Sequence, residues 1–187
     1  MMYSDDLSVR EAREIYFENS GFDQGTYTDR WVKFPVLGRT IYLPNIKLRR
    51  DAVPLHDIDH VLTEYKTDWE GEWQICSYEL GTGCGTYWGA WLINAQAILA
   101  GGIRTPKACL KAFARGRRSQ GVFFFTSVEP LLEERLSILR ERTTAPERNI
   151  HPNSFDFLLF FSLVIAAYVV HFLPIAAIIF LSMEAFK

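Results

Sequence analysis

The sequence predicts a mainly α-helical protein: a body of residues 1–145 with one short β-hairpin, a linker of residues 146–156, and a C-terminal transmembrane helix over residues 157–183. Residues 157–183 include no Asp, Glu, Lys or Arg, and about 20 apolar residues are enough for a helix to cross a bilayer. The rest of the 187-residue chain is long enough for one domain with its own core. Capping residues and glycine stops recur along that part, which is typical of successive helices.

The first helix and the hairpin have clear local signals. Ser8 with Glu11 forms a capping box, and Gly21 follows the helix predicted for residues 9–19. Residues 22–50 then contain glycines, prolines and the β-prone stretches WVKF and TIYL. This composition predicts a long surface connection with one short hairpin near Gly38.

Two helices are predicted in the middle of the chain. One begins at Pro54 and carries two histidines. Thr67 with Glu70 makes a second capping box, which predicts a helix over residues 68–80. The glycines of the GTGCG stretch then end that helix. They do not indicate a nucleotide-binding loop, because no strand is predicted before them.

The second half of the body is also predicted to be helical. The apolar run YWGAWLINAQAILAGG predicts a buried helix that ends at Gly101 and Gly102, and Thr105 with Pro106 at the first helical position begins the next one. After Gly121, the run VFFFTS is expected to form a short strand or an apolar plug. A further helix is predicted over residues 129–142.

Composition and charge narrow the function classes. The formal net charge of −2 and the pI of about 6.1 give no indication of a nucleic-acid partner. The polar, acidic N-terminus excludes a signal peptide there. Three cysteines without a CxxC pair favour a reducing compartment. Arginines at positions 135, 140, 142 and 148 precede the anchor, which places the body on the cytoplasmic side, as in a bacterial inner membrane.

The stretch HDIDHVLTEYKTDWEGE, residues 56–72, contains the candidate metal ligands. On a helix that turns about 100° per residue, His56, Asp57 and His60 fall within an arc of about 100°, whereas Asp59 points away. Histidines at positions i and i+4 are a metal-binding spacing. Glu72 lies early on the next helix, and an antiparallel helix pair would return it over the same face.

Two nitrogen and two oxygen donors suit zinc, iron or manganese better than calcium. The alternative is a solvated histidine pair without metal. HDIDH is not the HExxH of zinc proteases, because Asp is one methylene shorter than their general base. Four histidines in the whole chain are also too few for a membrane di-iron hydroxylase or desaturase.

The pattern of His56, Asp57, His60 and, after eleven more residues, Glu72 resembles the HDxxH…E metal motif of the coenzyme Q (ubiquinone) biosynthesis protein four family. YELG in the following helix, FARGRRS at residues 113–119 and PLLEERL at residues 130–136 are similar to that family in order and spacing. The resemblance covers about residues 28–140, and it implies that these four side chains are the ligands.

The resemblance also implies a function. The family is mainly α-helical, is associated with membranes and with the assembly of ubiquinone-making enzymes, and has been linked to replacing the ring carboxylate of a polyprenylated precursor by a hydroxyl. The implied partners are a polyprenylated aromatic lipid, other ubiquinone-biosynthesis proteins and the membrane, and a homo-oligomer stays open. Two departures indicate a divergent branch: Glu64 stands where the family has the glycine of VLTG, and the C-terminal anchor is not a general family feature.

Further residues are candidates for supporting roles. Glu64 falls on the histidine face of the helix wheel, and Cys76 and Glu79 follow Glu72 at helical spacing, so all three are candidate outer-layer residues of the site. A basic stripe predicted to contact lipid head groups or a substrate phosphate, with an ordinary solvated face as the alternative, consists of Lys107, Lys111, Arg115 and Arg118. Aromatic residues predicted to line an isoprenoid groove, or to be plain core, are Tyr87, Trp88 and Trp91.

Three classes of function therefore remain. The chain is a metal-dependent enzyme acting by decarboxylation or hydroxylation on a polyprenylated hydroxybenzoate-type lipid, a non-catalytic scaffold with a structural metal, or a metal-dependent hydrolase or hydroxylase of another membrane lipid. Zinc, as a Lewis acid, is the first choice of metal. Iron or manganese is the alternative, since two histidines and a carboxylate resemble the arrangement that activates dioxygen on iron.

Overall fold

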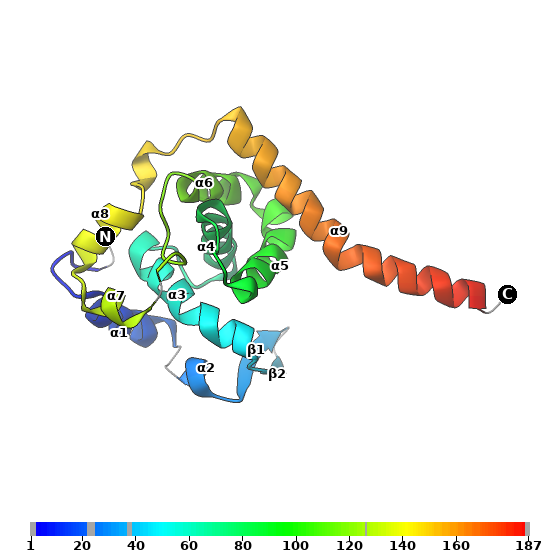
Figure 1. The fold of residues 1–187 in the computed structure, drawn as a ribbon, viewed down its shortest axis with the longest axis horizontal. Helices are drawn as coiled ribbons and strands as arrows, with labels where there is room; N and C mark the ends of the chain where they lie inside the picture. Colours follow the sequence, from blue (N-terminus) through cyan, green and yellow to red (C-terminus); the bar gives the residue numbers. More distant parts are fainter. Residues whose placement is uncertain (1–2, 22–24, 37–38, 126, 186–187) are drawn as a thin grey trace.

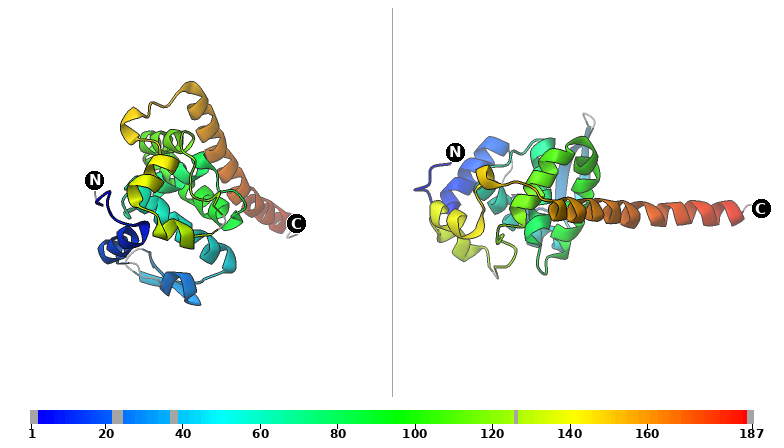
Figure 2. Two further views of the ribbon diagram at one scale, coloured as in Figure 1. Left: turned by 60° about the vertical axis from the view of Figure 1, so that its left-hand side comes forward. Right: turned by 90° about the horizontal axis from the view of Figure 1, so that it is seen from above.

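The computed structural model describes residues 3–21, 25–36, 39–125 and 127–185 of the chain. Helices α3 (Lys47–Thr63), α5 (Trp88–Arg104) and α6 (Pro106–Gly116) surround α4 (Trp69–Thr82) in the middle of the body (Figure 1). Helix α9 (Ser154–Ala185) leaves the body on one side (Figures 1 and 2). The predicted mainly helical class is confirmed.

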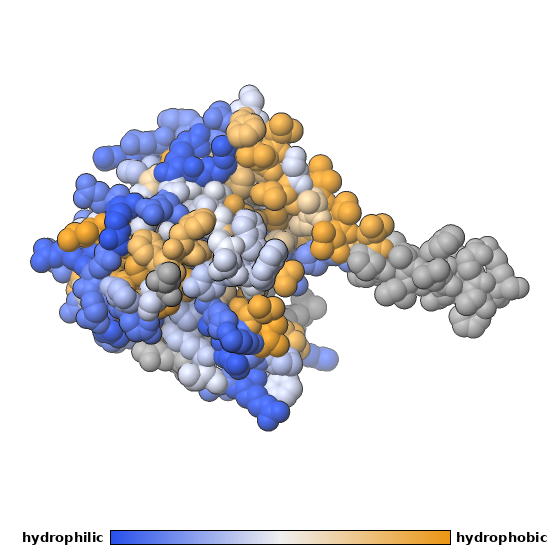
Figure 3. Space-filling model, in the orientation of Figure 1, coloured by the Kyte–Doolittle hydropathy of each residue, from blue (hydrophilic) through white to orange (hydrophobic). Residues whose placement is uncertain are grey.

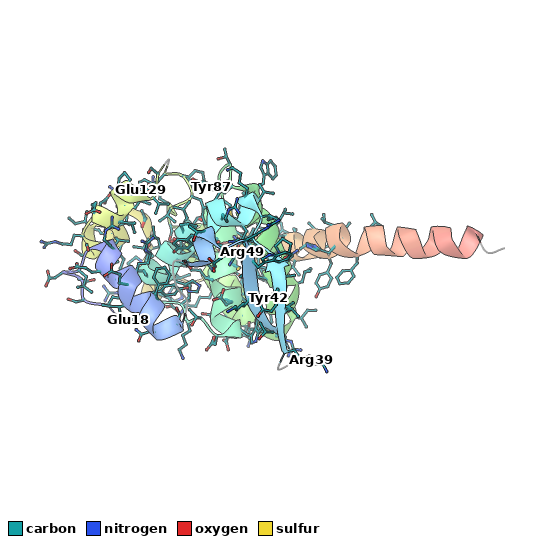
Figure 4. All side chains as sticks on the ribbon, turned by 90° about the horizontal axis from the view of Figure 1, so that it is seen from below. Glu18, Arg39, Tyr42, Arg49, Tyr87 and Glu129 are labelled. Atoms are coloured by element: carbon teal, nitrogen blue, oxygen red, sulfur yellow. The ribbon has the colours of Figure 1, made fainter. Side chains whose placement is uncertain are left out.

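The first helix and the hairpin have their predicted positions. Helix α1 (Val9–Ser20) begins with the Ser8–Glu11 capping box, and Gly21 ends it in the left-handed conformation. The short helix α2 (Gly25–Thr28) follows. Strands β1 (Trp31–Val36) and β2 (Arg39–Pro44) then pair antiparallel, with Trp31 opposite Pro44. The turn expected near Gly38 lies outside the described residues. Arg39 and Tyr42 of β2 lie at the edge of the body (Figure 4).

Helix α3 begins at Lys47, seven residues before the predicted start at Pro54. The predicted start is wrong because Pro54, a residue type typical of the first helical turn, lies inside the helix. An internal proline costs about 3 kcal/mol. Ala52 and Leu55 on either side of it are both buried in the core, and full burial of one leucine stabilises by roughly 1.5–3 kcal/mol. The burial of these side chains therefore offsets much of the local cost of the proline.

Helix α4 lies close to the predicted range of 68–80, but its cap differs. The carboxylate of Asp68, not the hydroxyl of Thr67, accepts the hydrogen bond from the amide of Gly71 at 2.9 Å. Glycines let α4 and α6 approach closely: a Cβ at Gly81 would lie 2.2 Å from the Phe113 oxygen, and one at Gly116 would lie 2.0 Å from the Tyr78 oxygen. This crossing fixes α4, which carries two glutamates of the candidate site.

The helix predicted for residues 129–142 is divided into α7 (Glu129–Glu133) and α8 (Leu136–Thr143). Arg135 between them forms an isolated antiparallel bridge with Ser8. The amide of Val9 donates to the Glu134 oxygen at 2.9 Å, and the amide of Leu136 donates to the Leu7 oxygen at 2.8 Å. Pairing with a distant segment thus interrupts a pattern that is locally helical.

The loop after α6 and the start of α9 complete the body. The VFFFTS stretch is no strand over its described residues, and Val122 and Phe123 fill the core as the predicted plug. A 3₁₀ turn (Glu147–Asn149) lies in the linker. Helix α9 begins at Ser154, and its part Ser154–Leu173 is long and apolar enough to cross a membrane.

Candidate metal centre

Helices α3 and α4 bring three candidate ligands together. His56 and His60 project from α3, and Glu72 projects from the first turns of α4. The Nε2 atom of His56 lies 3.5 Å from Glu72 Oε2, and that of His60 lies 3.4 Å from Glu72 Oε1. Ligand atoms of these three residues all lie within 4.8 Å of one another. The expectation that Glu72 would return over the histidine face is confirmed.

Hydrogen bonds fix which nitrogen of each histidine is available. His60 Nδ1 lies 2.9 Å from the Tyr65 carbonyl oxygen, which can only accept, so Nδ1 carries the proton. His56 Nδ1 lies 2.7 Å from Glu79 Oε1 and donates to it in the same way. In neutral imidazole the other nitrogen then has a free lone pair. Both lone pairs lie on the Nε2 atoms that face Glu72.

His60 provides an observation that a metal would explain. Its side chain is 1% exposed, and within the described part of the chain no hydrogen-bond partner reaches its Nε2 atom. An unpaired buried polar atom costs about 1–3 kcal/mol. A divalent cation between the two Nε2 atoms and the Glu72 carboxylate would satisfy it. His56 and Glu72 are only partly buried, which leaves an approach from solvent.

Charge at the site is balanced between the histidines and the glutamates. Although burial opposes it, the negative charges of Glu79 and Glu72 hold the pKa of His56 well above its usual value. Burial would likewise raise the pKa of Glu72, but the His56 and His60 imidazoles beside its carboxylate hold that pKa well below its usual value. A divalent cation at this position would balance the negative charge of Glu72 in place of the histidine protons.

Asp57 lies at the histidine helix but not in the three-residue group. Its carboxylate accepts hydrogen bonds from the Tyr27 hydroxyl at 2.6 Å and the Tyr16 hydroxyl at 3.2 Å. Burial raises its pKa, and the neighbouring His56 partly offsets this. Tyr16 also stacks on the His60 ring, with centroids 5.5 Å apart. Neither tyrosine could be predicted from the pattern around the histidines, because both come from distant helices.

Glu79, which was predicted to lie near the candidate ligands, contacts one of them, His56. It is 1% exposed, and its Oε2 atom accepts from the Asn94 amide at 2.7 Å. Asn94 therefore orients the Glu79 carboxylate, and this carboxylate in turn orients the His56 ring. Asn94 was not among the predicted site residues, although a polar side chain within the apolar run of α5 was a signal for it.

Asp59 of α3 is not part of the three-residue group of candidate ligands. It is fully buried, and among the residues that the structure describes neither carboxylate oxygen has a hydrogen-bond partner. Burial and the charge of Glu79 raise its pKa well above the usual value. The carboxyl groups of Asp59 and Glu79 therefore lie in a region where one negative charge is more favourable than two.

Glu64 and Cys76 are less suited to the metal. Helix α3 ends at Thr63, and Glu64 adopts the left-handed conformation at φ +61°. Its carboxylate lies 3.3 Å from Arg140. Cys76 is buried, and burial together with Glu79 and Glu72 raises its pKa well above the usual value, so it is a neutral thiol. Thiolates, not thiols, are metal ligands.

Most of the basic stripe is bound within the chain. Lys111 pairs with Glu147 at 2.7 Å. Arg115 is buried and donates to the backbone oxygens of Thr63 and Ala145. Arg118 pairs with Asp156 at 2.8 Å, whereas Lys107 is exposed. Three of the four cations thus hold the linker and the start of α9 against α6.

The aromatic residues at the start of α5 do not form one groove. Tyr87 and Trp88 line a cavity of about 430 Å³ with Leu48 and Asp51 of α3, and Tyr87 is labelled in Figure 4. Trp91 is half-buried, and its indole donates to the Gly85 oxygen at 3.1 Å. It lines a separate apolar groove between α5 and α9.

Comparison with protein-family models, with curated proteins and with solved structures finds no match to this chain. The candidate site therefore stands on its own geometry.

Proposed function

We propose that this chain binds one divalent metal ion through His56, His60 and Glu72, at a membrane. The observation that carries the proposal is the buried Nε2 atom of His60, which faces Glu72 and has no hydrogen-bond partner among the described residues. Two imidazoles and one carboxylate, with a position left open, form a ligand set of catalytic zinc. Iron accepts the same set.

The proposed substrate is a polyprenylated hydroxybenzoate-type lipid, and the proposed pathway is ubiquinone biosynthesis. Support comes from the HDxxH…E pattern and from the apolar helix α9, which suits a membrane-borne substrate. A carboxylate or phenolate head group would be attracted to a bound cation. The arginines before α9 favour a cytoplasmic position of the body.

The proposed reaction is decarboxylation of the aromatic head group. The bond between the ring and the carboxylate breaks, CO₂ leaves, and a proton adds to the ring carbon that keeps the electron pair. A bound cation would supply electrostatic stabilisation of the negative charge that develops. Glu79 and the Tyr65 carbonyl would hold the imidazoles, and replacement of the carboxylate by a hydroxyl would require dioxygen as oxidant.

Elemental analysis of protein purified without chelator tests the metal. We expect one metal ion per chain in the wild type and a clear loss in His60→Ala. The control is Glu70→Gln, which changes an exposed residue on the same turn of α4 as Glu72 and should keep the metal. A wild type without metal would overturn the proposal.

Mass spectrometry of co-purifying lipids and turnover of a prenylated hydroxybenzoate test the substrate. We expect a bound aromatic lipid, and release of CO₂ that is lost in a folded His56→Ala variant. A bound lipid without an aromatic head group would favour a hydrolase or hydroxylase of another lipid. If the wild type binds metal but shows no turnover, and if His56→Ala unfolds, the results would favour a scaffold whose metal is structural.

A further inference from the structure

The first half of α9 is packed on the body rather than projecting from it. Phe160, Val164 and Ala167 are buried in a cluster with side chains of α4, α5 and α6. A Cβ at Gly102 of α5 would lie 2.9 Å from Val164, so the glycine permits this close approach. The Tyr168 hydroxyl donates to the Leu99 oxygen of α5 at 2.6 Å.

The beginning of α9 is also fixed by charge. Asp156 is fully buried and pairs with Arg117 at 2.5 Å and with Arg118 at 2.8 Å, both at the end of α6. Asn153 and Asp156 exchange side-chain to backbone hydrogen bonds that cap the helix. The body therefore holds α9 from its first turn to Tyr168.

The length of α9 then decides where a bilayer can lie. A span needs about 20 residues, and the uncharged run covers residues 157–183. Every window of about 20 residues within that run includes residues 164–176. The part of the run after Tyr168, before Glu184, is too short by itself to cross the hydrocarbon core. Part of the contact between α9 and the body must consequently lie among the lipid chains.

The surface beside that contact is apolar. A groove of about 170 Å³ between the two helices is lined by Leu92 and Ala95 of α5 and by Ala166 and Val170 of α9. Leu92 is 50% exposed and Val170 is 64% exposed. Helix α5 has no charged residue before Arg104, its last. Hydrophobic residues cover this side of the molecule along α9 (Figure 3).

We propose that α5 enters the bilayer together with α9, so that lipid acyl chains occupy the α5–α9 groove. This inference rests on the proposed insertion of α9 in a membrane. The same helix carries Asn94, whose amide donates to Glu79 beside the candidate metal centre. One helix would thus connect the lipid phase with the site, and a membrane-borne head group would need no transfer through water to approach it.

Depth-dependent quenching in vesicles tests the inference. The full-length protein is reconstituted in palmitoyl-oleoyl phosphatidylcholine vesicles and labelled with the fluorophore NBD at Leu92→Cys, Val170→Cys or Ile138→Cys. All three sites are exposed in the wild type, and Ile138 lies on α8 away from the groove. The native cysteines are buried, so unsubstituted protein is the labelling blank.

We expect acyl-chain nitroxide lipids to quench the label at positions 92 and 170 to a similar extent, with a blue shift of its emission, and to leave position 138 unaffected. Quenching at 170 without quenching at 92 would overturn the inference and leave the insertion of α9 intact. Absence of quenching at both positions would overturn the inference and the proposed insertion together.

Discussion

Glu79 Oε1 lies 2.7 Å from His56 Nδ1, and between α3 and α4 the glutamate is buried and the histidine is partly buried. A carboxylate that accepts from the remote nitrogen of a metal-binding imidazole fixes its tautomer and makes it a stronger ligand. The Asn94 amide in turn holds the other oxygen of Glu79. Glu79 and Asn94 therefore hold the ring of His56 in the orientation that turns its Nε2 atom toward Glu72.

Removal of the Glu79 charge should weaken metal binding. In Glu79→Gln the amide oxygen can still accept from His56, but the imidazole becomes a poorer donor to the metal, and we expect affinity to fall about 10- to 100-fold. Competition with a chromogenic chelator measures the change. Glu70→Gln on the exposed face of α4 is the matched control. Equal affinity in Glu79→Gln and wild type would show that Glu79 does not act through His56.

The Asp57→Asn variant should show whether Asp57 is a metal ligand or only supports the fold around the site. Because both oxygens of Asp57 accept from Tyr16 and Tyr27, we expect the variant to keep its metal and to lose about 1–3 kcal/mol of unfolding free energy. Metal content and urea denaturation measure the two effects. A loss of metal equal to that of His60→Ala would instead make Asp57 a ligand, as the sequence motif implies.

The pair of Glu72 with the histidines should give the metal-free protein a defined pH dependence. The lowered pKa of Glu72 means that its contribution to stability is present above its ordinary pKa, about 4.3, and is lost as pH falls through the folded value. The raised pKa of His56 means that its contribution is present below its ordinary pKa, about 6.5, and is lost as pH rises through the folded value.

The stability difference between chelator-treated wild type and Glu72→Gln should therefore be largest between about pH 4.5 and 6.5. Because Glu72 is partly exposed, we expect a maximum of about 1 kcal/mol. Urea denaturation across the pH range measures it. A difference that does not vary with pH would contradict the ion pairing of Glu72.

The left-handed conformation of Glu64 should cause a difference in stability between two variants at this position. Glu64→Ala and Glu64→Gly both lose the contact with Arg140, but only alanine keeps a Cβ at φ +61°. Such a Cβ costs roughly 1 kcal/mol, so we expect Glu64→Gly to be more stable than Glu64→Ala by about that amount, with the same metal content. The opposite order in thermal denaturation would argue against a strained helix end.

The sequence predicted the local parts of the structure well. The capping box at Ser8, the hairpin strands, and the face of α3 that carries His56 and His60 all depend on residues close in the chain. Predictions failed where distant segments intervene: the bridge of Arg135 to Ser8 divides α7 from α8. Glu64 lies beyond the end of α3 at Thr63, and its carboxylate contacts Arg140 of α8 instead of joining the histidine face.

Periodicity by itself determined what each helix presents: two histidines on one turn of α3, glutamates along one face of α4, and an apolar run long enough for a membrane. Tertiary packing alone decided how these surfaces are used. It placed Glu72 within reach of both histidines, gave Asp57 to two tyrosines, and laid the first half of α9 against α5. The physical reason is that helical spacing depends on neighbouring residues, whereas the partner of each face depends on which distant helix packs against it.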